Sequence, residues 1–316
     1  MGLPFVARRL PRASWLPELL ARLTLASGVG YFAAAYTVSR WLTRPSRNRP
    51  KTSPGDHGLA WESVRCGTAD GMRLSGWVIT PPSPRGTIVL FHGLRSNREQ
   101  TLSRCVFLTA AGFRCVAFDH RAHGESTGKR TSFGYHESRD VGAILELVEQ
   151  RWPGQPRAAL GISMGAAALC YAADWARNLH AVILESPYRD IATAFGNRIG
   201  AGYPAWFRRL SQGVIWVTER RLSLRLDQLA PIHHIGRLAP VPVLLLTGTE
   251  DAHAPPEDLQ LLYESCRDPR EMWLVPGAGH KDVCETGGQP YRERVLGFLD
   301  RWMSSSAEPA PATPAA

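Results

Sequence analysis

A serine flanked by glycines, Gly161-Ile162-Ser163-Met164-Gly165, stands where an apolar run meets an alanine-rich segment. Residues 157–160 before it are expected to form a short strand, and residues 166–173 after it are good helix formers. A sharp turn from strand to helix would push the Ser163 hydroxyl out of the sheet. Glycines on either side would avoid collisions between Cβ atoms and the neighbouring backbone. A hydroxyl held in this way is suited to nucleophilic attack, which needs a base and an acid that orients the base.

The candidate for the orienting acid is Asp251. It ends a turn that follows a buried-strand pattern at residues 243–246, and ligand chemistry gathers at the carboxyl ends of parallel strands. Glu250 is its closest rival, and Glu185, after an expected strand at residues 182–184, is a weaker one. The alternative interpretation of Asp251 is an ordinary loop carboxylate or a helix cap.

The candidate for the base is His280. It closes the glycine-rich loop at residues 276–280, beyond a strand-like run at residues 272–275. A histidine in such a loop could reach Ser163 with one ring nitrogen and Asp251 with the other. The chain has ten histidines, so the position of His280 after a strand, rather than its residue type, is what favours it.

A place for a developing negative charge can also be predicted. The apolar strand at residues 87–91 runs into His92-Gly93-Leu94, and the glycine would let the backbone approach a substrate. The backbone N–H groups of Leu94 and Met164 could then form an oxyanion hole. His92 is expected to support this turn rather than to act as the base.

In this order, these segments resemble the α/β-hydrolase superfamily and, within it, the serine aminopeptidase-like group of α/β-hydrolase domain proteins, many of which are tethered to membranes. The resemblance runs from about residue 60 to about residue 303 and implies a serine hydrolase that needs no cofactor. One departure is Ala122, where the family usually has glycine. The segments that carry the resemblance are residues 68–77, 91–93, 118–126, 161–165, 248–251 and 279–280.

The pattern along the chain agrees with that fold. Apolar strands alternating with helical stretches predict an α/β domain over residues 59–303, with a mostly parallel eight-stranded sheet covered by helices on both faces. The first two strands, joined by Asp70-Gly71, are expected to pair as a hairpin. Residues 186–240 are too long for a simple connection and predict a crossover helix with a small cap over the active site. Expected strands cover residues 62–68, 72–80, 87–91, 114–119, 157–162, 181–185, 241–247 and 271–275. Expected helices cover residues 98–111, 137–151, 164–177, 256–266 and 290–303.

Residues 1–58 differ from the rest of the chain in charge and composition. Residues 1–51 hold nine basic side chains and one acidic one, which accounts for +8 of the formal net charge of +9. The remainder is almost neutral, so the basic composition does not indicate a nucleic-acid-binding face. Residues 43–58, rich in Pro, Ser and Arg, have the composition of a linker. Residues 304–316, rich in Ala and Pro, are expected to be a disordered tail.

An uncharged stretch, Leu23 to Ser39, lies within the basic segment. As a helix its seventeen residues would span roughly 25 Å, a little less than a bilayer core. Three interpretations stay open: a membrane anchor over residues 15–41, with Trp15 and Trp41 at its ends; a cleaved signal sequence; and an amphipathic surface helix. Membrane association is the favoured expectation, and the charges do not settle which side carries the enzyme.

No Cys-x-x-Cys pair or histidine cluster has the spacing of metal ligands, so no structural zinc is predicted. Several of the six cysteines lie within apolar strands or helices and are expected to be small core residues; the even count permits disulfides without requiring them. The predicted activity is hydrolysis of carboxylic esters or thioesters through an acyl-enzyme formed on Ser163. Peptide cleavage, lipid acyl hydrolysis or acyl transfer on the same three residues stay open, as does an inert binding protein built on a hydrolase scaffold.

Overall fold

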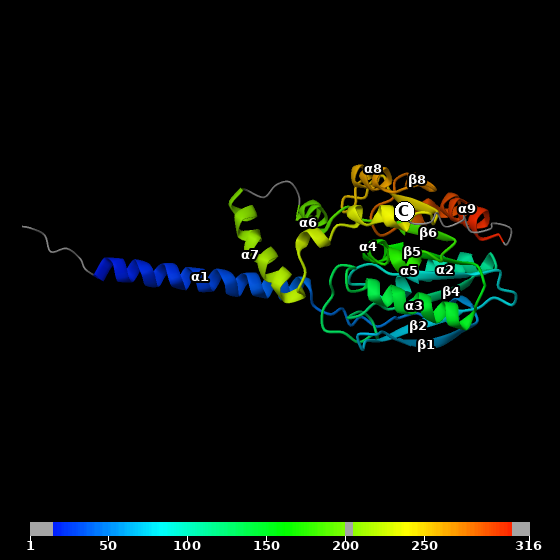
Figure 1. Ribbon diagram of the computed structural model, residues 1–316, viewed down its shortest axis with the longest axis horizontal. Coiled ribbons are helices and arrows are strands. Elements are labelled where there is room, and N and C mark those ends of the chain that lie inside the picture. Colours follow the sequence, from blue (N-terminus) through cyan, green and yellow to red (C-terminus); the bar gives the residue numbers. More distant parts are fainter. Residues whose placement is uncertain (1–14, 200–204, 305–316) are drawn as a thin grey trace, which may run out of the picture. The chain divides into compact units, whose positions relative to one another are not determined.

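The structure is a computed structural model that describes residues 15–199 and 205–304 (Figure 1). Its described residues form one eight-stranded sheet with the strand order β1-β2-β4-β3-β5-β6-β7-β8. β1 and β2 pair as the antiparallel hairpin that the sequence predicts, β2 runs antiparallel to β4, and all other neighbours are parallel. The strands are β1 (Trp61–Gly67), β2 (Arg73–Ile79), β3 (Thr87–Phe91), β4 (Arg114–Phe118), β5 (Arg157–Ile162), β6 (Ala181–Glu185), β7 (Val243–Gly248) and β8 (Arg270–Val275).

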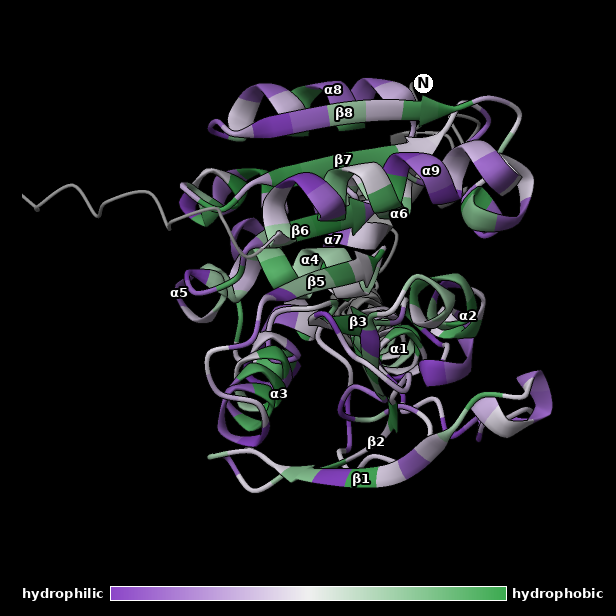
Figure 2. Cartoon of the chain, turned by 90° about the vertical axis from the view of Figure 1, so that its right-hand side faces the viewer, coloured by the Kyte–Doolittle hydropathy of each residue, from purple (hydrophilic) through white to green (hydrophobic). Residues whose placement is uncertain are grey.

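Helices cover both faces of this sheet, as Figure 2 shows for α3 and α2 on its opposite sides. The central strands β3 to β7 are buried along their whole length, because their side chains meet a helical layer on each face. One apolar core lies under α3, α4, α5 and α8, and the other under α2 and α9. The helices are α2 (Leu102–Ala110), α3 (Ser138–Arg151), α4 (Met164–Tyr171), α5 (Ala173–Ala176), α8 (Pro256–Ser265) and α9 (Val283–Met303). All six cysteines are buried and free, and the predicted role as core residues is confirmed.

Three predicted helices differ clearly from those in the structure. The expected helix at residues 164–177 is divided into α4 and α5. The expected helix at residues 98–111 is a short 3-10 helix, η2 (Arg98–Thr101), followed by α2. The expected helix at residues 290–303 begins earlier, at Val283, and is kinked at Gly288, whose φ is 51° and ψ is −129°. Proline has no N–H and fits the first turn of a helix, so Pro290 favours a break just before it. Glycine takes the positive φ that this break requires.

The insertion at residues 186–240 contains α6 (Ile191–Ile199), α7 (Ala205–Leu222) and the short 3-10 helices η3 (Leu226–Gln228), η4 (Pro231–His233) and η5 (Ile235–Leu238). α7 forms a compact unit with α1 (Trp15–Leu42), and the rest of the described chain forms the other unit. Within the first unit, the Tyr31 hydroxyl accepts a hydrogen bond from the Gly213 N–H at 2.8 Å. The Ser39 hydroxyl accepts one from Arg221 at 2.8 Å. These contacts explain why α7 pairs with α1, a partner that sequence spacing does not reveal.

The N-terminal segment forms the long helix α1, which covers the whole predicted membrane anchor. Among the described residues, no helix combines the length and the apolar character that a membrane span requires. The transmembrane interpretation of residues 15–41 is therefore not supported. Most of the predicted tail, residues 305–316, lies outside the described residues.

The segment at residues 43–58, whose composition predicts a linker, is ordered in the structure. Ser46 forms a parallel bridge with His123, and the Thr131 N–H donates to the Thr43 carbonyl at 3.1 Å. Pro54 is buried within the short 3-10 helix η1 (Pro54–His57). These backbone bonds make the segment part of the larger unit, a property that its Pro- and Arg-rich composition does not indicate.

Candidate active site

Ser163 lies at the tight turn between β5 and α4, in the conformation that its flanking glycines predict. Its φ is 52° and its ψ is −107°, a strained backbone for a residue with a Cβ. A Cβ on Gly161 would lie 2.6 Å from the Ala166 nitrogen, and one on Gly165 would lie 2.4 Å from the Phe91 carbonyl oxygen. The Ser163 N–H donates to the Glu185 carbonyl oxygen at 2.8 Å. The turn therefore exists only because glycines occupy both flanks and β6 holds its apex.

The structure brings the three predicted residues together. The Ser163 Oγ and the His280 Nε2 are 3.1 Å apart. The His280 Nδ1 lies 2.8 Å from Asp251 Oδ2 and 3.0 Å from Asp251 Oδ1. With the Nδ1 proton directed to the carboxylate, Nε2 is left as the acceptor for the serine hydroxyl. This is the geometry of a nucleophile, its base and the acid that fixes the base's tautomer.

Asp251 is held as a carboxylate by its surroundings. Besides His280, it accepts hydrogen bonds from the Ala254 N–H at 2.8 Å and the Thr247 hydroxyl at 2.8 Å. Burial alone would raise the pKa of this carboxyl. The hydrogen bonds from His280, Ala254 and Thr247, together with the His280 charge, bring the pKa below its ordinary value. Asp251 therefore stays ionised at neutral pH and can stabilise an imidazolium on His280.

The two rival carboxylates have other surroundings. Glu250 is exposed, whereas Asp251 is only 1% exposed. Glu185 is buried in an ion pair with Arg104 of α2 and accepts a hydrogen bond from the Tyr291 hydroxyl at 2.6 Å. Neither has a hydrogen bond to His280 among the described residues.

The predicted oxyanion donors stand in the loops after β3 and β5. Met164 is the first residue of α4, so its N–H has no acceptor within the helix. Leu94 follows the β3 turn, and its N–H donates to no acceptor in the described part of the chain. Both donors are thus available to a bound group.

His92 supports the turn before Leu94, as the sequence predicts. Its Nδ1 lies 2.7 Å from the Gly93 carbonyl oxygen, and its Nε2 accepts the His120 N–H at 3.0 Å. Burial, together with the charges of His120 and His123, holds the pKa of His92 well below its ordinary value. A neutral ring with both nitrogens engaged is a structural element and is not the base.

Sequence reasoning misses two contacts around the site. The side-chain oxygen of Gln100, in η2, accepts a hydrogen bond from the Gly93 N–H at 2.8 Å and so holds the loop that follows β3. The His253 ring packs edge to face against the His280 ring, with centroids 5.1 Å apart. No motif marks these residues, because their role depends on loop geometry. In the described residues no group of three or more histidine, cysteine or acidic side chains is arranged to hold a metal ion.

The loop that carries His280 has a steric requirement at Gly248. A Cβ at Gly248 would lie 1.9 Å from the Ala278 carbonyl oxygen, so Gly248→Ala must displace the backbone before His280. We expect Gly248→Ala to lower the melting temperature by roughly 5–10 °C, which corresponds to about 3 kcal/mol for a domain of this size. Gly297→Ala is the matched control, because a Cβ there meets nothing within 4 Å. Equal melting temperatures for the two variants in thermal unfolding would show that the backbone of Gly248 does not lie so close to the Ala278 carbonyl oxygen.

Comparisons with known proteins agree with this fold. Residues 82–234 match the family model described as serine aminopeptidase, S33. The uncharacterized protein YqkD of Bacillus subtilis is 28% identical over 248 residues, which cover 76% of this chain and 79% of that protein. The uncharacterized protein Rv2307c of Mycobacterium tuberculosis is 27% identical over 300 residues, which cover 92% of this chain and 96% of that protein.

Among solved structures, the esterase Pf2001 of Pyrococcus furiosus is similar over 83% of this chain and 99% of its own, with a TM-score of 0.69 and 26% identity. The α/β hydrolase GrgF of a Penicillium species, at 19% identity and a TM-score of 0.64, shares the fold. The sheet order, the residues matched by the family model and these structural similarities together show that the chain belongs to the α/β-hydrolase superfamily.

Proposed function

We propose that this protein is a serine hydrolase that cleaves carboxylic esters or thioesters, with Ser163 as nucleophile, His280 as base and Asp251 as the orienting acid. The observation that carries the proposal is the unbroken chain of contacts, Ser163 Oγ to His280 Nε2 at 3.1 Å and His280 Nδ1 to Asp251 at 2.8 Å. The esterase of Pyrococcus furiosus, which shares the fold over 83% of this chain, supports the same reaction class.

The reaction would proceed in two steps. His280 Nε2 takes the proton of the Ser163 hydroxyl as the serine oxygen attacks the carbonyl carbon. The negative charge that forms on the carbonyl oxygen is stabilised by the N–H groups of Leu94 and Met164. The imidazolium then protonates the leaving alcohol or thiol, and an acyl group stays on Ser163. In the second step His280 removes a proton from water, the resulting hydroxide attacks the acyl carbon, and Ser163 recovers its proton as the acid is released.

Peptide cleavage is the second candidate, because the matching family model is described as a serine aminopeptidase. An aminopeptidase also has to recognise a free amino terminus, for which a carboxylate close to the nucleophile is the usual partner. The Asp251 carboxylate is committed to His280, and the carboxylate of Glu185, whose carbonyl holds the Ser163 N–H, is committed to Arg104. Ester or thioester hydrolysis is therefore favoured, since it needs only the three residues and the oxyanion donors. Lipid acyl hydrolysis and acyl transfer use the same steps.

A panel of substrates tests whether ester and thioester hydrolysis is preferred to peptide cleavage. Purified full-length protein is assayed with p-nitrophenyl esters of increasing acyl length, acyl thioesters and aminoacyl p-nitroanilides. We expect measurable kcat/KM for the first two groups and a value at least about 100-fold lower for the anilides, because the amide has a poorer leaving group and no recognised amino terminus. Faster cleavage of the anilides would favour the peptidase over the esterase.

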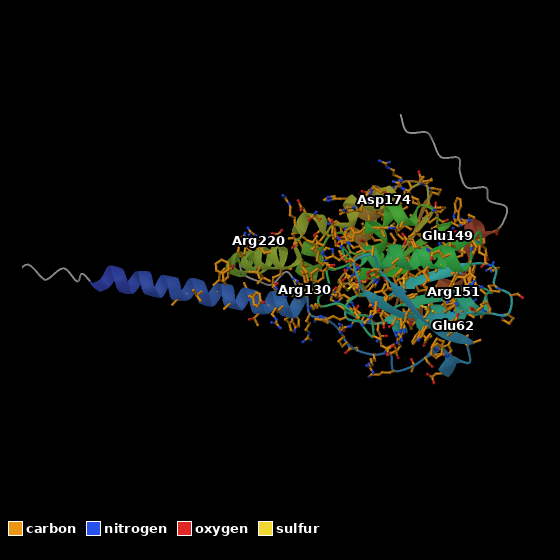
Figure 3. All side chains as sticks on the ribbon, turned by 60° about the horizontal axis from the view of Figure 1, so that its bottom comes forward. Glu62, Arg130, Glu149, Arg151, Asp174 and Arg220 are labelled. Carbon is orange, nitrogen blue, oxygen red and sulfur yellow. The ribbon has the colours of Figure 1, made fainter. Side chains whose placement is uncertain are left out.

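We also propose that the unit formed by α1 and α7 binds the surface of an anionic membrane. Large apolar side chains are exposed on both helices: Phe32 is 49% exposed, Trp41 is 50% and Trp216 is 48%. Basic residues end each helix. Arg40 lies in the last turn of α1, and Arg220, labelled in Figure 3, lies in the last turn of α7. Aromatic rings beside cationic side chains suit the interface between headgroups and acyl chains.

Vesicle sedimentation tests the membrane proposal. The full chain should sediment with vesicles that contain about 30% phosphatidylglycerol and much less with pure phosphatidylcholine, since each basic residue near an anionic surface contributes about 1 kcal/mol. Replacement of Phe32 and Trp216 by serine should abolish this binding, whereas Leu261→Ser, which alters an exposed apolar residue of α8, should not. Binding that survives the double change, or that ignores lipid charge, would contradict the proposal.

A further inference from the structure

Residues Thr43–Thr52, which we call the strap, run along the loops that follow β3 and β4. The Ser46 N–H donates to the Ala122 carbonyl oxygen at 2.8 Å, and the Gly124 N–H donates to the Ser46 carbonyl oxygen at 2.8 Å. The Arg47 guanidinium donates to the backbone carbonyls of Ser126 and Gly128. The strap is therefore bonded to the loop after β4 by its own backbone and by a side chain.

The same segment reaches the loop after β3, which carries the proposed oxyanion donor. The Ser46 hydroxyl donates to the Arg95 carbonyl oxygen at 3.2 Å. The Asn97 side-chain amide donates to the Asn48 carbonyl oxygen at 3.0 Å. The Glu99 carboxylate accepts the N–H groups of Lys51 at 2.9 Å and Thr52 at 3.1 Å.

The Glu99 carboxylate also accepts the Thr52 hydroxyl at 2.6 Å. Burial opposes the charge on Glu99, but the hydrogen bonds from Thr52 and Lys51 outweigh it and lower the pKa of the carboxyl. Glu99 thus remains an ionised acceptor for the strap at neutral pH.

Ser46 lies between two strained residues. Arg95 and Ala122 both have a φ of 61°, in the left-handed region that is unfavourable for a residue with a Cβ. A glycine at position 122 would be free of this strain. The carbonyl oxygens of both strained residues accept hydrogen bonds from Ser46. One strap residue therefore helps to hold two loops in conformations that they would not favour alone.

Leu94 is fixed on both sides by this arrangement. Before it, the Gly93 N–H is held by Gln100 at 2.8 Å. After it, the Arg95 N–H donates to His123 Nε2 at 3.2 Å and the Arg95 carbonyl accepts from Ser46. The peptide planes on either side of the Leu94 N–H are thereby set, and the direction of an oxyanion donor depends on those planes.

We infer that the strap is a clamp that positions the oxyanion loop, residues 92–101, and that Ser46 and Glu99 are positioning residues for hydrolysis. The inference rests on the proposed function for its effect on rate, and on the hydrogen bonds above for its effect on the loop. Neither residue touches the substrate. They act by holding the Leu94 N–H where charge develops, and such a contribution appears in kcat rather than in KM.

A graded set of variants in the full-length protein tests the clamp. Ser46→Ala with Glu99→Ala removes the hydroxyl bond to Arg95 and the acceptor for Lys51 and Thr52. We expect kcat for a p-nitrophenyl ester to fall about tenfold, less than for complete loss of a donor, with KM within about twofold of its original value. Glu99→Gln, with Ser46 unchanged, keeps one acceptor oxygen for the strap. Its kcat should therefore recover most of the rate that the double variant loses.

Glu62→Ala is the control, because it removes a surface carboxylate paired with Arg151 elsewhere on the same unit (Figure 3). Its kcat should not change. Circular dichroism and melting temperature confirm that each variant is folded.

Hydrogen exchange tests the clamp independently of the proposed hydrolase activity. In the double variant, peptides covering residues 92–101 should exchange at least about threefold faster, because the amides of Gly93, Arg95 and Gln100 lose support, while Glu62→Ala leaves them unchanged. Unaltered exchange in the double variant would overturn the clamp, whatever the protein hydrolyses. Faster exchange in a protein inert towards every ester would uphold the clamp and refute the hydrolase.

Discussion

Replacing Ser163 by alanine should lower kcat for ester hydrolysis by at least about 10⁴-fold, because no other group can form the acyl intermediate. The melting temperature should stay the same or rise slightly. The Ser163 side chain occupies a strained turn, and within residues 15–199 and 205–304 its hydroxyl has one hydrogen bond to lose, that to His280. Steady-state kinetics with p-nitrophenyl esters, together with thermal unfolding, measure both quantities.

The matched control for Ser163 is Ser265→Ala, which alters an exposed serine whose hydroxyl donates to the Leu261 carbonyl oxygen within α8. It should keep full activity. An alanine variant at 163 that retained more than about one tenth of the original kcat would remove this serine from its assigned role, since the loss of an essential nucleophile never costs so little.

The second large effect is expected for Asp251→Asn. Asparagine keeps one acceptor oxygen, which the N–H groups of His253 and Ala254 would occupy, and its NH2 group would donate to His280 Nδ1. The ring would then take the tautomer that leaves Nε2 protonated. In serine proteases the corresponding change lowers kcat about 10⁴-fold with the geometry intact. The pKa of Asp251 lies below its ordinary value, so the wild-type carboxylate stays charged through neutral pH and the loss is expected across that range.

Glu250→Gln provides the comparison for Asp251, because it neutralises the adjacent carboxylate, which is exposed. Its activity should remain within about twofold of the original, as for other surface charges far from a reacting atom. If Glu250→Gln abolished turnover and Asp251→Asn did not, the assignment of the acid would have to be reversed.

Much of this fold can be predicted from the sequence because its signals are local. Buried parallel strands have continuous apolar runs, and those at residues 87–91, 157–162 and 181–185 match β3, β5 and β6 residue for residue. The meeting of Ser163, Asp251 and His280 is predictable for a related reason. Each residue follows a strand, and the carboxyl ends of parallel strands meet at one edge of the sheet.

What the sequence does not reveal depends on contacts between distant segments. The pairing of α1 with α7 joins residues 182 positions apart, through Tyr31 and Gly213, and no periodicity connects them. The strap has the Pro- and Arg-rich composition of a flexible linker, yet its backbone bonds to two loops of the sheet. Composition reports how a segment would behave alone, and here tertiary hydrogen bonds override that behaviour. The break at Gly288 is hidden in the same way, because an isolated glycine before a proline does not show where the helix begins.

The most direct test of the central claim is reaction with a fluorophosphonate probe, followed by intact mass measurement and peptide mapping. A serine activated by a base attacks the phosphorus atom and expels fluoride, so the account predicts one stable adduct per chain, located on Ser163 and absent from Ser163→Ala. An unmodified protein, as an inert scaffold would give, or an adduct on a different serine, would contradict it.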